Sequence, residues 1–281
     1  MKTKTHGFIC AATSPEYVKL AYMLSLSLKL TYQSGGLSIV VSNLNDVDED
    51  MKWAFDAIVE IPQPEGVANF YNRSFFFEAS PYDYTMALDA DMIFSKNIDP
   101  WWELLDKRPV VMGTALTYRN KLITNRQFRE VFDRARLYDA YSACFMFDKS
   151  KKSKELFELM KDLFVNWNKW RGILPTPFCL TQDATTDVSL GIATKALGLK
   201  SAYLGWRPKF IHLKPELQDN ALDEWVDPKI CLSPQPYSYV AERSIIEIGR
   251  IKQIYPVHYF KKEWTTDDKI KLMKECYHAL C

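Results

Sequence analysis

Two aspartates one residue apart, Asp89 and Asp91, are the residues best placed for chemistry in this sequence. They lie between two apolar runs, 84–88 and 92–94. The first run is short and follows turn-type residues, which predicts a buried strand that ends just before Asp89. Carboxylates at the end of a buried strand are costly unless they are paired. A divalent cation with a phosphorylated ligand would offset this cost, because Mg2+ and Mn2+ favour carboxylate and phosphate oxygens.

A second acidic run, 46–50, is a rival for the same interpretation. A calcium loop counted from Asp46 fails, because Met51 occupies the glycine position and Ala57 the final glutamate position. We interpret this run as the solvated start of a helix. Context therefore favours Asp89 and Asp91, although an acidic strand end with a purely structural role stays open as the alternative.

Composition and charge limit the class of protein. The 281 residues are 47% hydrophobic and 14% aromatic, which suffices for a large core in one domain or two closely joined ones. The net charge of +1 gives no general case for a polyanionic partner. Segment 119–154, however, has ten basic residues against four acidic ones. These could form solvated helix faces or, alternatively, a surface for a phosphate-rich acceptor.

The six cysteines include no Cys-x-x-Cys pair, which argues against a zinc ribbon or a redox motif. Several lie in apolar runs, as small core residues do. The N-terminal residues show neither a signal peptide nor a membrane span. We therefore expect a protein of the reducing cytoplasm.

Short apolar runs alternate with amphipathic segments along most of the chain. We predict strands at 5–12, 37–41, 57–61, 84–88, 109–117 and 140–147. We predict helices at 15–32, 49–55, 69–79, 118–138, 150–167, 183–197 and 265–280, and a proline-rich loop at 172–182. This alternation indicates an α/β fold with a mainly parallel, doubly wound sheet.

Ligands of such sheets bind beyond the carboxyl ends of the strands. Ala11 and Thr13 lie at the C-terminal end of the first predicted strand, Asn43 follows the second, and Asp89 and Asp91 follow the fourth. We expect these residues to meet in one crevice. The sequence has no Gly-x-Gly-x-x-Gly and no Gly-Lys-Ser/Thr, which argues against a dinucleotide site and a phosphate loop.

Four further side chains are candidates for this crevice. Arg73, one segment before the aspartates, could be a surface charge or could contact a diphosphate. His258, in an aromatic run, could be a core residue or a third metal ligand, and His212 competes for that role. Lys261 could neutralise a leaving diphosphate.

Together these residues resemble the GT-A-type nucleotide-sugar glycosyltransferases, nearest to the glycogenin-like and lipopolysaccharide galactosyltransferase group. The resemblance rests on Thr13 and Tyr17 after the first strand, on Leu-Asp-Ala-Asp-Met at 88–92 and on the motif around His258. It covers residues 5–110 well, 140–200 loosely and 255–264 locally. The Leu-Asp-Ala-Asp-Met match is fairly specific, and the other features are weak singly.

The resemblance implies a single GT-A catalytic domain, 1–214, with a C-terminal extension, 215–281, that contributes His258 and Lys261. The implied activity is metal-dependent sugar transfer from a nucleoside diphosphate sugar, with UDP favoured, to a hydroxyl acceptor. The implied ligands of Mn2+ or Mg2+ are Asp89, Asp91 and His258. The implied donor-binding residues are Ala11, Thr13, Tyr17, Asn43, Arg73, Asp89 and Lys261. The implied catalytic residues are Asp91 and Asp187, with Asp183 as the weaker alternative to Asp187, and helix capping explains either acid equally well.

The sequence departs from the family pattern in two places. The family's asparagine-serine-glycine turn is Tyr141, Ser142 and Ala143 here, and Phe260 to Lys262 replace the glycine after the histidine. Because of these changes, the family pattern does not predict the acceptor pocket. We still expect a retaining enzyme. The acceptor could be a saccharide or a hydroxymethylated base of phage DNA. A non-catalytic nucleotide-sugar-binding module and a nucleotidyltransferase remain the alternative functions.

Overall fold

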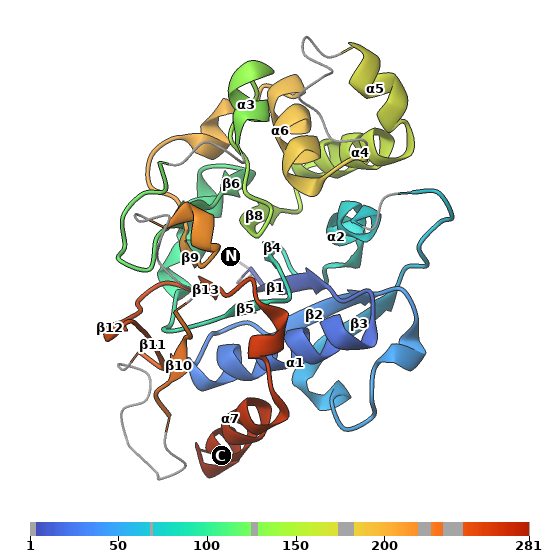
Figure 1. Ribbon diagram of the computed structural model, residues 1–281. Coiled ribbons are helices and arrows are strands. Elements are labelled where there is room, and N and C mark those ends of the chain that lie inside the picture. Colours follow the sequence, from blue (N-terminus) through green and yellow to red (C-terminus); the bar gives the residue numbers. More distant parts are fainter. Residues whose placement is uncertain are drawn as a thin grey trace.

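The computed structural model describes residues 4–67, 70–124, 129–173, 183–218, 226–232 and 244–280. A six-stranded sheet in the order β3-β2-β1-β4-β8-β6 lies at its centre (Figure 1). The first four of these strands are mutually parallel, and β8 is antiparallel to both β4 and β6. The strands are β1 (His6–Ala11), β2 (Leu37–Val41), β3 (Phe55–Glu60), β4 (Tyr84–Leu88), β6 (Val110–Met112) and β8 (Cys144–Asp148). The predicted α/β fold with a mainly parallel sheet is confirmed.

Helices cover both faces of this sheet (Figure 1). One face packs against α1 (Pro15–Leu30) and α7 (Asp267–Leu280), and the other packs against α4 (Lys151–Val165) and α6 (Thr186–Ala196). Three short helices are α2 (Phe76–Ala79), α3 (Glu130–Arg134) and α5 (Trp167–Ile173). Strand side chains alternate between the faces, so Phe8 contributes to the core beside α1 and Ile9 to the core beside α4.

The first helix begins where its sequence predicts. The Ser14 hydroxyl caps it by accepting a hydrogen bond from the Tyr17 amide at 3.4 Å, and Pro15 occupies its first position. No helix among the described residues is long and apolar enough to cross a membrane.

A second, four-stranded sheet joins segments from distant parts of the chain in the order β5-β13-β9-β7. Its strands are β5 (Met92–Ile93), β7 (Thr114–Leu116), β9 (Lys209–His212) and β13 (Val257–His258). Strand β13 pairs antiparallel with β5 and parallel with β9. The strands before and after residue 214 therefore share one sheet. A third sheet consists of β10 (Lys229–Ile230), β11 (Ile246–Ile248) and β12 (Ile251–Lys252).

The prediction of one strand over 109–117 is wrong, because the chain passes from the first sheet to the second at Gly113. Strands β6 and β7 lie on either side of this glycine. Its amide donates a hydrogen bond to the Cys144 carbonyl at 2.9 Å, and a Cβ atom there would lie 2.2 Å from the same oxygen. Only glycine permits this close approach to β8.

The prediction of a helix over 118–138 is also wrong for most of its length. The chain turns back at Asn120, whose φ is 62°, and the Thr117 amide donates to the Lys121 carbonyl at 2.8 Å. The helix α3 forms later and has only five residues. Residues 125–128 of this segment and 174–182 of the predicted loop lie outside the described residues. The predicted helix at 69–79 is a 3-10 helix, Tyr71–Phe75, followed by α2, and residue 69 also lies outside the described residues.

Candidate functional site

Asp89 and Asp91 follow β4 at the edge of the sheet where β1 also ends. The parallel register sets Cys10 beside Leu88, so β1 ends at Ala11 within one residue of the end of β4. The Asp89 amide donates to the Ala143 carbonyl at 3.1 Å, and the Asp91 carbonyl accepts from the Tyr259 amide at 3.1 Å. Backbone contacts from distant segments therefore fix both aspartates.

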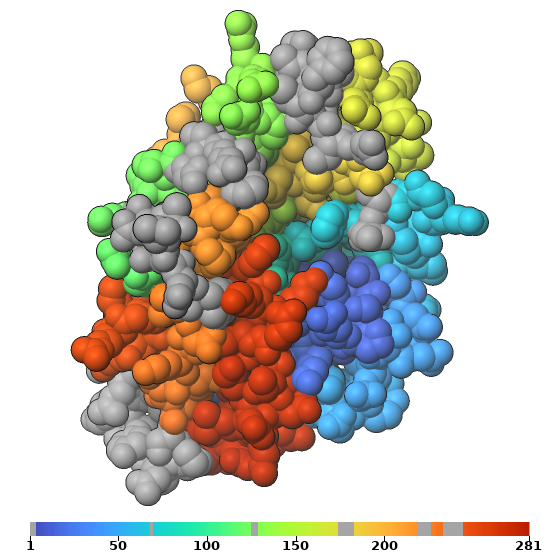
Figure 2. All heavy atoms as spheres, in the orientation of Figure 1, coloured from blue at the N-terminus to red at the C-terminus, as the bar shows by residue number. Residues whose placement is uncertain are grey.

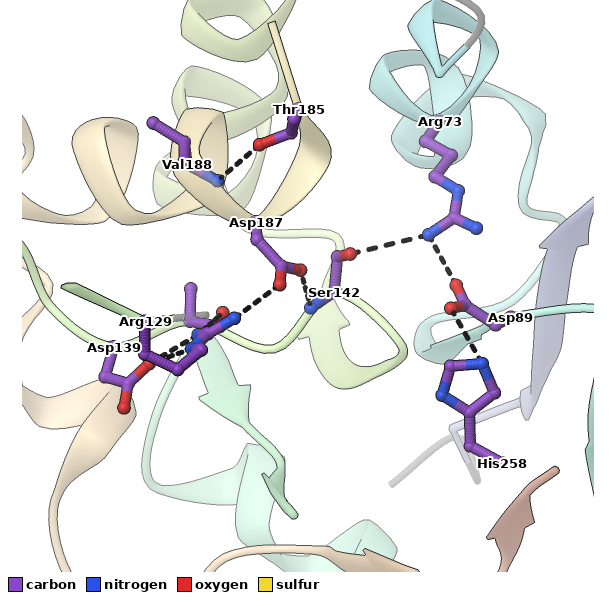
Figure 3. A network of polar contacts seen from close by, with 10 residues as sticks. Arg73, Asp89, Arg129, Asp139, Ser142, Thr185, Asp187, Val188 and His258 are labelled. Carbon is purple, nitrogen blue, oxygen red and sulfur yellow. Dashed lines mark hydrogen bonds and ion pairs between the residues drawn. The ribbon is translucent and has the colours of Figure 1, made fainter. Parts of the chain in front are cut away.

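His258 joins the two aspartates because β13 pairs with β5. The register sets His258 beside Met92, the residue after Asp91. Its Nε2 atom lies 3.1 Å from Asp91 Oδ1 and 3.6 Å from Asp89 Oδ2 (Figure 3). One possible ligand atom from each of the three side chains lies within 4.8 Å of the others. Asp91 and His258 are both buried, with 8% of each residue exposed.

The charges of this group stabilise one another. Burial alone would lower the pKa of His258, but the neighbouring Asp91 and Asp89 carboxylates raise it to about 9. Burial alone would raise the pKa of Asp91, but His258 and Arg73 hold it below its ordinary value. In the metal-free protein the imidazole is therefore protonated at neutral pH. Because a cation takes neutral imidazole as a ligand, metal binding would release this proton.

Arg73 connects these aspartates to the crevice beside them. It lies in the 3-10 helix Tyr71–Phe75, and its Nη1 atom is 2.5 Å from Asp89 Oδ1. The same nitrogen donates to Ser142 Oγ at 3.5 Å. Burial opposes its charge, but Asp89 raises the pKa of the guanidinium above its ordinary value. Arg73 is thus a fixed cation next to the candidate metal ligands.

A cavity of about 440 Å3 opens where β1 and β2 end. Its lining residues are Ala11, Thr13, Ser14, Tyr17, Ser42, Gln63, Phe70 and Arg73. The structure thus brings Ala11, Thr13, Tyr17 and Arg73 together, as the crevice argument expects. Asn43 instead caps a turn by accepting a hydrogen bond from the Asn45 amide at 2.9 Å, and its neighbour Ser42 lines the cavity.

The lysine that contacts Tyr17, a residue of the cavity wall, is Lys262, one residue after the predicted Lys261. Its ammonium donates a hydrogen bond to the Tyr17 hydroxyl and lies 4.1 Å from the centre of the Tyr17 ring. Lys261 is exposed, and its amide donates to the Tyr259 carbonyl at 2.6 Å. The sequence shows the lysine pair, but only the turn after β13 decides which lysine faces Tyr17.

His212 is a neighbour of the possible metal-ligand group and not a member of it. Its ring stacks on His258 with 4.6 Å between the ring centres, as the pairing of β9 with β13 requires. Burial, and then the charge of His258, hold the pKa of His212 well below its ordinary value. Among the described residues, the group that could hold a metal consists of Asp89, Asp91 and His258.

Asp187 lies in the first turn of α6, whose cap is Thr185. Its carboxylate accepts the Ser142 amide at 2.7 Å and Arg129 Nη1 at 2.6 Å. Burial opposes the charge, but Arg129 and the Ser142 amide hold the pKa of Asp187 below its ordinary value. Asp183 is exposed and precedes the helix, so it does not belong to the first helical turn.

Sequence analysis missed the role of Arg129 as the partner of Asp187. Arg129 is buried, with 6% of the residue exposed, and its Nε atom donates to Asp139 Oδ1 at 2.8 Å. Its guanidinium lies 4.1 Å from the ring centre of Phe132 and 4.0 Å from that of Tyr141. It looked like one of ten basic surface residues, and no local pattern distinguishes it from the others.

A continuous polar network links the two groups of charges. It runs from Asp139 and Arg129 through Asp187 and Ser142 to Arg73, Asp89 and His258 (Figure 3). Figure 2 shows a hollow in the middle of the face that it draws, between the red C-terminal segment, the blue N-terminal segment and the yellow segment above them. The candidate site is therefore a set of alternating positive and negative side chains beside a cavity.

Comparison with known proteins supports the fold. No protein-family model and no curated protein matches the sequence. The structure is similar to that of the galactosyltransferase LgtC in complex with donor and acceptor sugar analogues, with 11% identity, a TM-score of 0.52, and 97% of this chain and 96% of LgtC covered. It also matches the glycosyltransferase GlyE of Streptococcus pneumoniae TIGR4 with 11% identity and a TM-score of 0.45 over 72% of this chain, which spans 45% of the length of GlyE. The chain therefore has the GT-A glycosyltransferase fold, the fold of LgtC.

Proposed function

We propose that the protein is a metal-dependent glycosyltransferase that moves a sugar from a nucleoside diphosphate sugar to a hydroxyl acceptor. One observation carries this proposal. Asp89, Asp91 and His258 form a possible metal-ligand group at a strand end, and Arg73 joins this group to the cavity lined by Thr13 and Tyr17. A nucleotide in the cavity would thus extend its diphosphate toward the carboxylates. We favour a UDP-sugar as the donor.

The residues present fit a divalent cation. Two carboxylates and one imidazole are ligands that Mn2+ accepts, and Mg2+ accepts the carboxylates. The His258 Nε2 atom faces the carboxylates, while its Nδ1 atom is buried and has no hydrogen-bond partner among the described residues. A cation bound by Asp89, Asp91 and His258 would neutralise negative charge on the donor diphosphate.

The cationic side chains would contact different parts of the donor diphosphate. Arg73 is held beside Asp89 and can donate to phosphate oxygens without leaving its position. The Lys262 ammonium, which donates a hydrogen bond to the Tyr17 hydroxyl, can neutralise negative charge that develops on the departing nucleoside diphosphate. We keep Lys261 as the second candidate for this role, because it adjoins Lys262 in the same turn.

Asp187 would act as a fixed carboxylate near the reacting sugar. Arg129 and the Ser142 amide both stabilise its charged form, which makes it a weak general base at neutral pH. An inverting transferase needs a base that takes the proton of the acceptor. The lowered pKa of Asp187 therefore supports retention of configuration. Asp187 would stabilise positive charge that develops on the sugar, and Asp91 would be a metal ligand.

A saccharide is the acceptor that we favour over a modified DNA base. A DNA acceptor would need the basic segment as a continuous phosphate-binding surface. Arg129 is instead buried between two carboxylates, and Arg134 pairs with Glu130 at 2.9 Å. Lys151, Lys152 and Lys154 lie on α4 and pair with glutamates, so they give the surface of this helix mixed charge.

Hydrolysis of a panel of nucleotide sugars tests this proposal. Purified protein is incubated with UDP-, GDP-, ADP- and CMP-sugars, in one series with Mn2+ and in another with EDTA. We expect slow release of nucleotide from one UDP-sugar, in the presence of the metal only. The anomeric configuration of the released sugar, read by NMR, tests retention. Absence of release from every donor would overturn the activity, and equal release in EDTA would overturn the metal requirement.

A further inference from the structure

A second cavity, of about 460 Å3, is lined by Asp139, which Arg129 connects to Asp187. Its walls come from β7, from residues 122–124, from the loop before β8 and from the segment that precedes β9. The residues that give it chemical character are Thr114, Tyr138, Asp139, Tyr141, Tyr203 and Arg207. Its size suits one or two sugar rings. None of these residues belongs to the donor cavity or to the possible metal-ligand group.

Arg207 contributes a positive charge to this cavity, and the nearby Asp139 carboxylate attracts it. Among the described residues, none forms an ion pair or a hydrogen bond with its half-buried guanidinium. Asp139, the acid that lines the same cavity, has its Oδ1 atom engaged by Arg129 at 2.8 Å. Arg108 is close enough to Arg207 for the two charges to repel, but it does not line the cavity, and its guanidinium donates to backbone carbonyls such as that of Trp206 at 2.9 Å. A half-buried arginine that has no hydrogen-bond partner among the described residues leaves its guanidinium donors available to an oxyanion.

Three tyrosines line the cavity together with aliphatic residues such as Leu122 and Leu137. Tyr138 and Tyr203 lie against each other with 5.0 Å between their ring centres. The Tyr203 hydroxyl bonds to the Thr194 hydroxyl at 2.9 Å, which fixes that ring in place. Tyr141 is fixed between Arg129 and Phe210. Rigid aromatic faces next to hydroxyl groups suit the C–H faces and hydroxyls of a sugar.

We propose that this second cavity binds a saccharide that carries a phosphate or carboxylate group, with the anionic group on Arg207 and a sugar ring against Tyr138, Tyr141 and Tyr203. The inference rests on the proposed function and names the acceptor class. Tyr141 lines the cavity and Ser142, the next residue, donates to Asp187. A saccharide in the cavity would therefore contact the loop that holds the carboxylate of the transfer site.

Isothermal titration with three simple probes tests this binding site. Glucose 6-phosphate, glucuronate and glucose are titrated into the full chain in EDTA, and then again with UDP and Mn2+ present to fill the donor cavity. We expect at least one anionic probe to bind about tenfold more tightly than glucose under both conditions. Whether the phosphate or the carboxylate probe binds more tightly identifies the anionic group.

Arg207→Gln and Arg136→Gln are the matched pair of variants. Arg136 is an exposed arginine of the basic segment 119–154, and it is not among the residues that line the cavity. We expect Arg207→Gln to weaken binding of the anionic probe about tenfold, and Arg136→Gln to leave it within about twofold. Arg207→Lys, which keeps the charge, serves if Arg207→Gln does not fold by circular dichroism, and we expect an intermediate affinity.

Three results would overturn the inference: no binding of either anionic probe, equal affinity for glucose and the anionic probes, or equal losses in the two glutamine variants. Displacement of the probe by UDP would also overturn it, because the probe would then occupy the donor cavity. Binding of UDP with Mn2+ is measured in the same samples. UDP binding without probe binding would refute this cavity alone, whereas loss of UDP binding would refute the proposed function.

Discussion

The two ends of the polar network are built in different ways. Around Asp89 and Asp91 the groups follow neighbouring parallel strands, and their carboxylates face an imidazole that a cation could join. Around Asp187 the protein itself supplies every contact, from the Arg129 guanidinium and the Ser142 amide. The first end is therefore suited to bind a charged ligand, and the second is suited to hold one carboxylate in a fixed state.

The largest effect is expected when one candidate metal ligand is neutralised, which tests whether the Asp89 and Asp91 end of the network binds a metal. Asp91→Asn should lower metal-dependent donor hydrolysis by roughly a hundredfold or more, because a buried anionic ligand is lost next to the diphosphate. The matched control is Asp48→Asn, in the exposed acidic run that also contains an Asp-x-Asp pattern. Hydrolysis within about tenfold of wild type in Asp91→Asn would remove this residue from the metal site.

The Asp187→Asn variant tests the end of the polar network around Asp187. We expect sugar transfer to fall by roughly a hundredfold while the affinity for UDP with Mn2+ stays within about twofold, because Asp187 contacts neither the cavity nor the metal-ligand group. Single-turnover transfer and isothermal titration measure the two quantities separately. Equal losses in both would mean that the two ends of the network are not functionally distinct.

Arg73 is the residue where the two ends meet, so its loss should affect binding more than chemistry. Arg73→Gln should weaken UDP binding in the presence of Mn2+ about tenfold, because one charge-assisted contact to the diphosphate disappears. Arg134→Gln, an exposed arginine paired with Glu130, is the control. An unchanged dissociation constant for Arg73→Gln would exclude it from the donor site.

The two lysines after His258 sharpen the description of the donor side. Lys262→Gln should weaken UDP binding roughly threefold, since its ammonium is held at Tyr17 on the cavity wall. Lys261→Gln should have a smaller effect, because this lysine is exposed. The reverse order in titration calorimetry would restore Lys261 as the lysine of the donor site.

The smallest expected effect is on acid stability. Asp187 has a lower pKa in the folded protein than in the unfolded chain, where it is about 3.9. Its contribution is therefore present above pH 4 and is lost as the pH falls through the folded value. Wild type should lose more unfolding free energy between pH 5 and pH 3 than Asp187→Asn does. Parallel losses in urea titrations would show that this carboxylate gains no net stabilisation on folding.

The meeting of the ends of β1 and β4 could be predicted from the sequence, because the periodicity of apolar residues locates the strands. Once the strands before Ala11 and Asp89 are recognised as parallel neighbours, their ends must lie at one edge. Pairing of β13 with β5, which delivers His258, has no local signal, and only the family motif indicated it. The choice between Lys261 and Lys262 depends on one turn after β13.

The other side could not be predicted, because tertiary contacts decide it. Arg129 belongs to a basic run that resembles a solvated helix, yet burial against Phe132 and pairing with Asp187 determine its role. The break at Gly113 is set by the close approach of the Cys144 carbonyl, which no apolar periodicity reveals. Both errors concern segment 109–138, where the chain changes from one sheet to the other.

Binding of UDP in the presence and absence of Mn2+ tests the central claim most directly. Isothermal titration of wild type and of the Asp91→Asn and Asp48→Asn variants measures it without any acceptor. The proposed site predicts Mn2+-dependent UDP binding in wild type and Asp48→Asn, and its loss in Asp91→Asn. UDP binding that is the same with Mn2+ and with EDTA, or that survives in Asp91→Asn, would contradict a metal-diphosphate site at Asp89, Asp91 and His258.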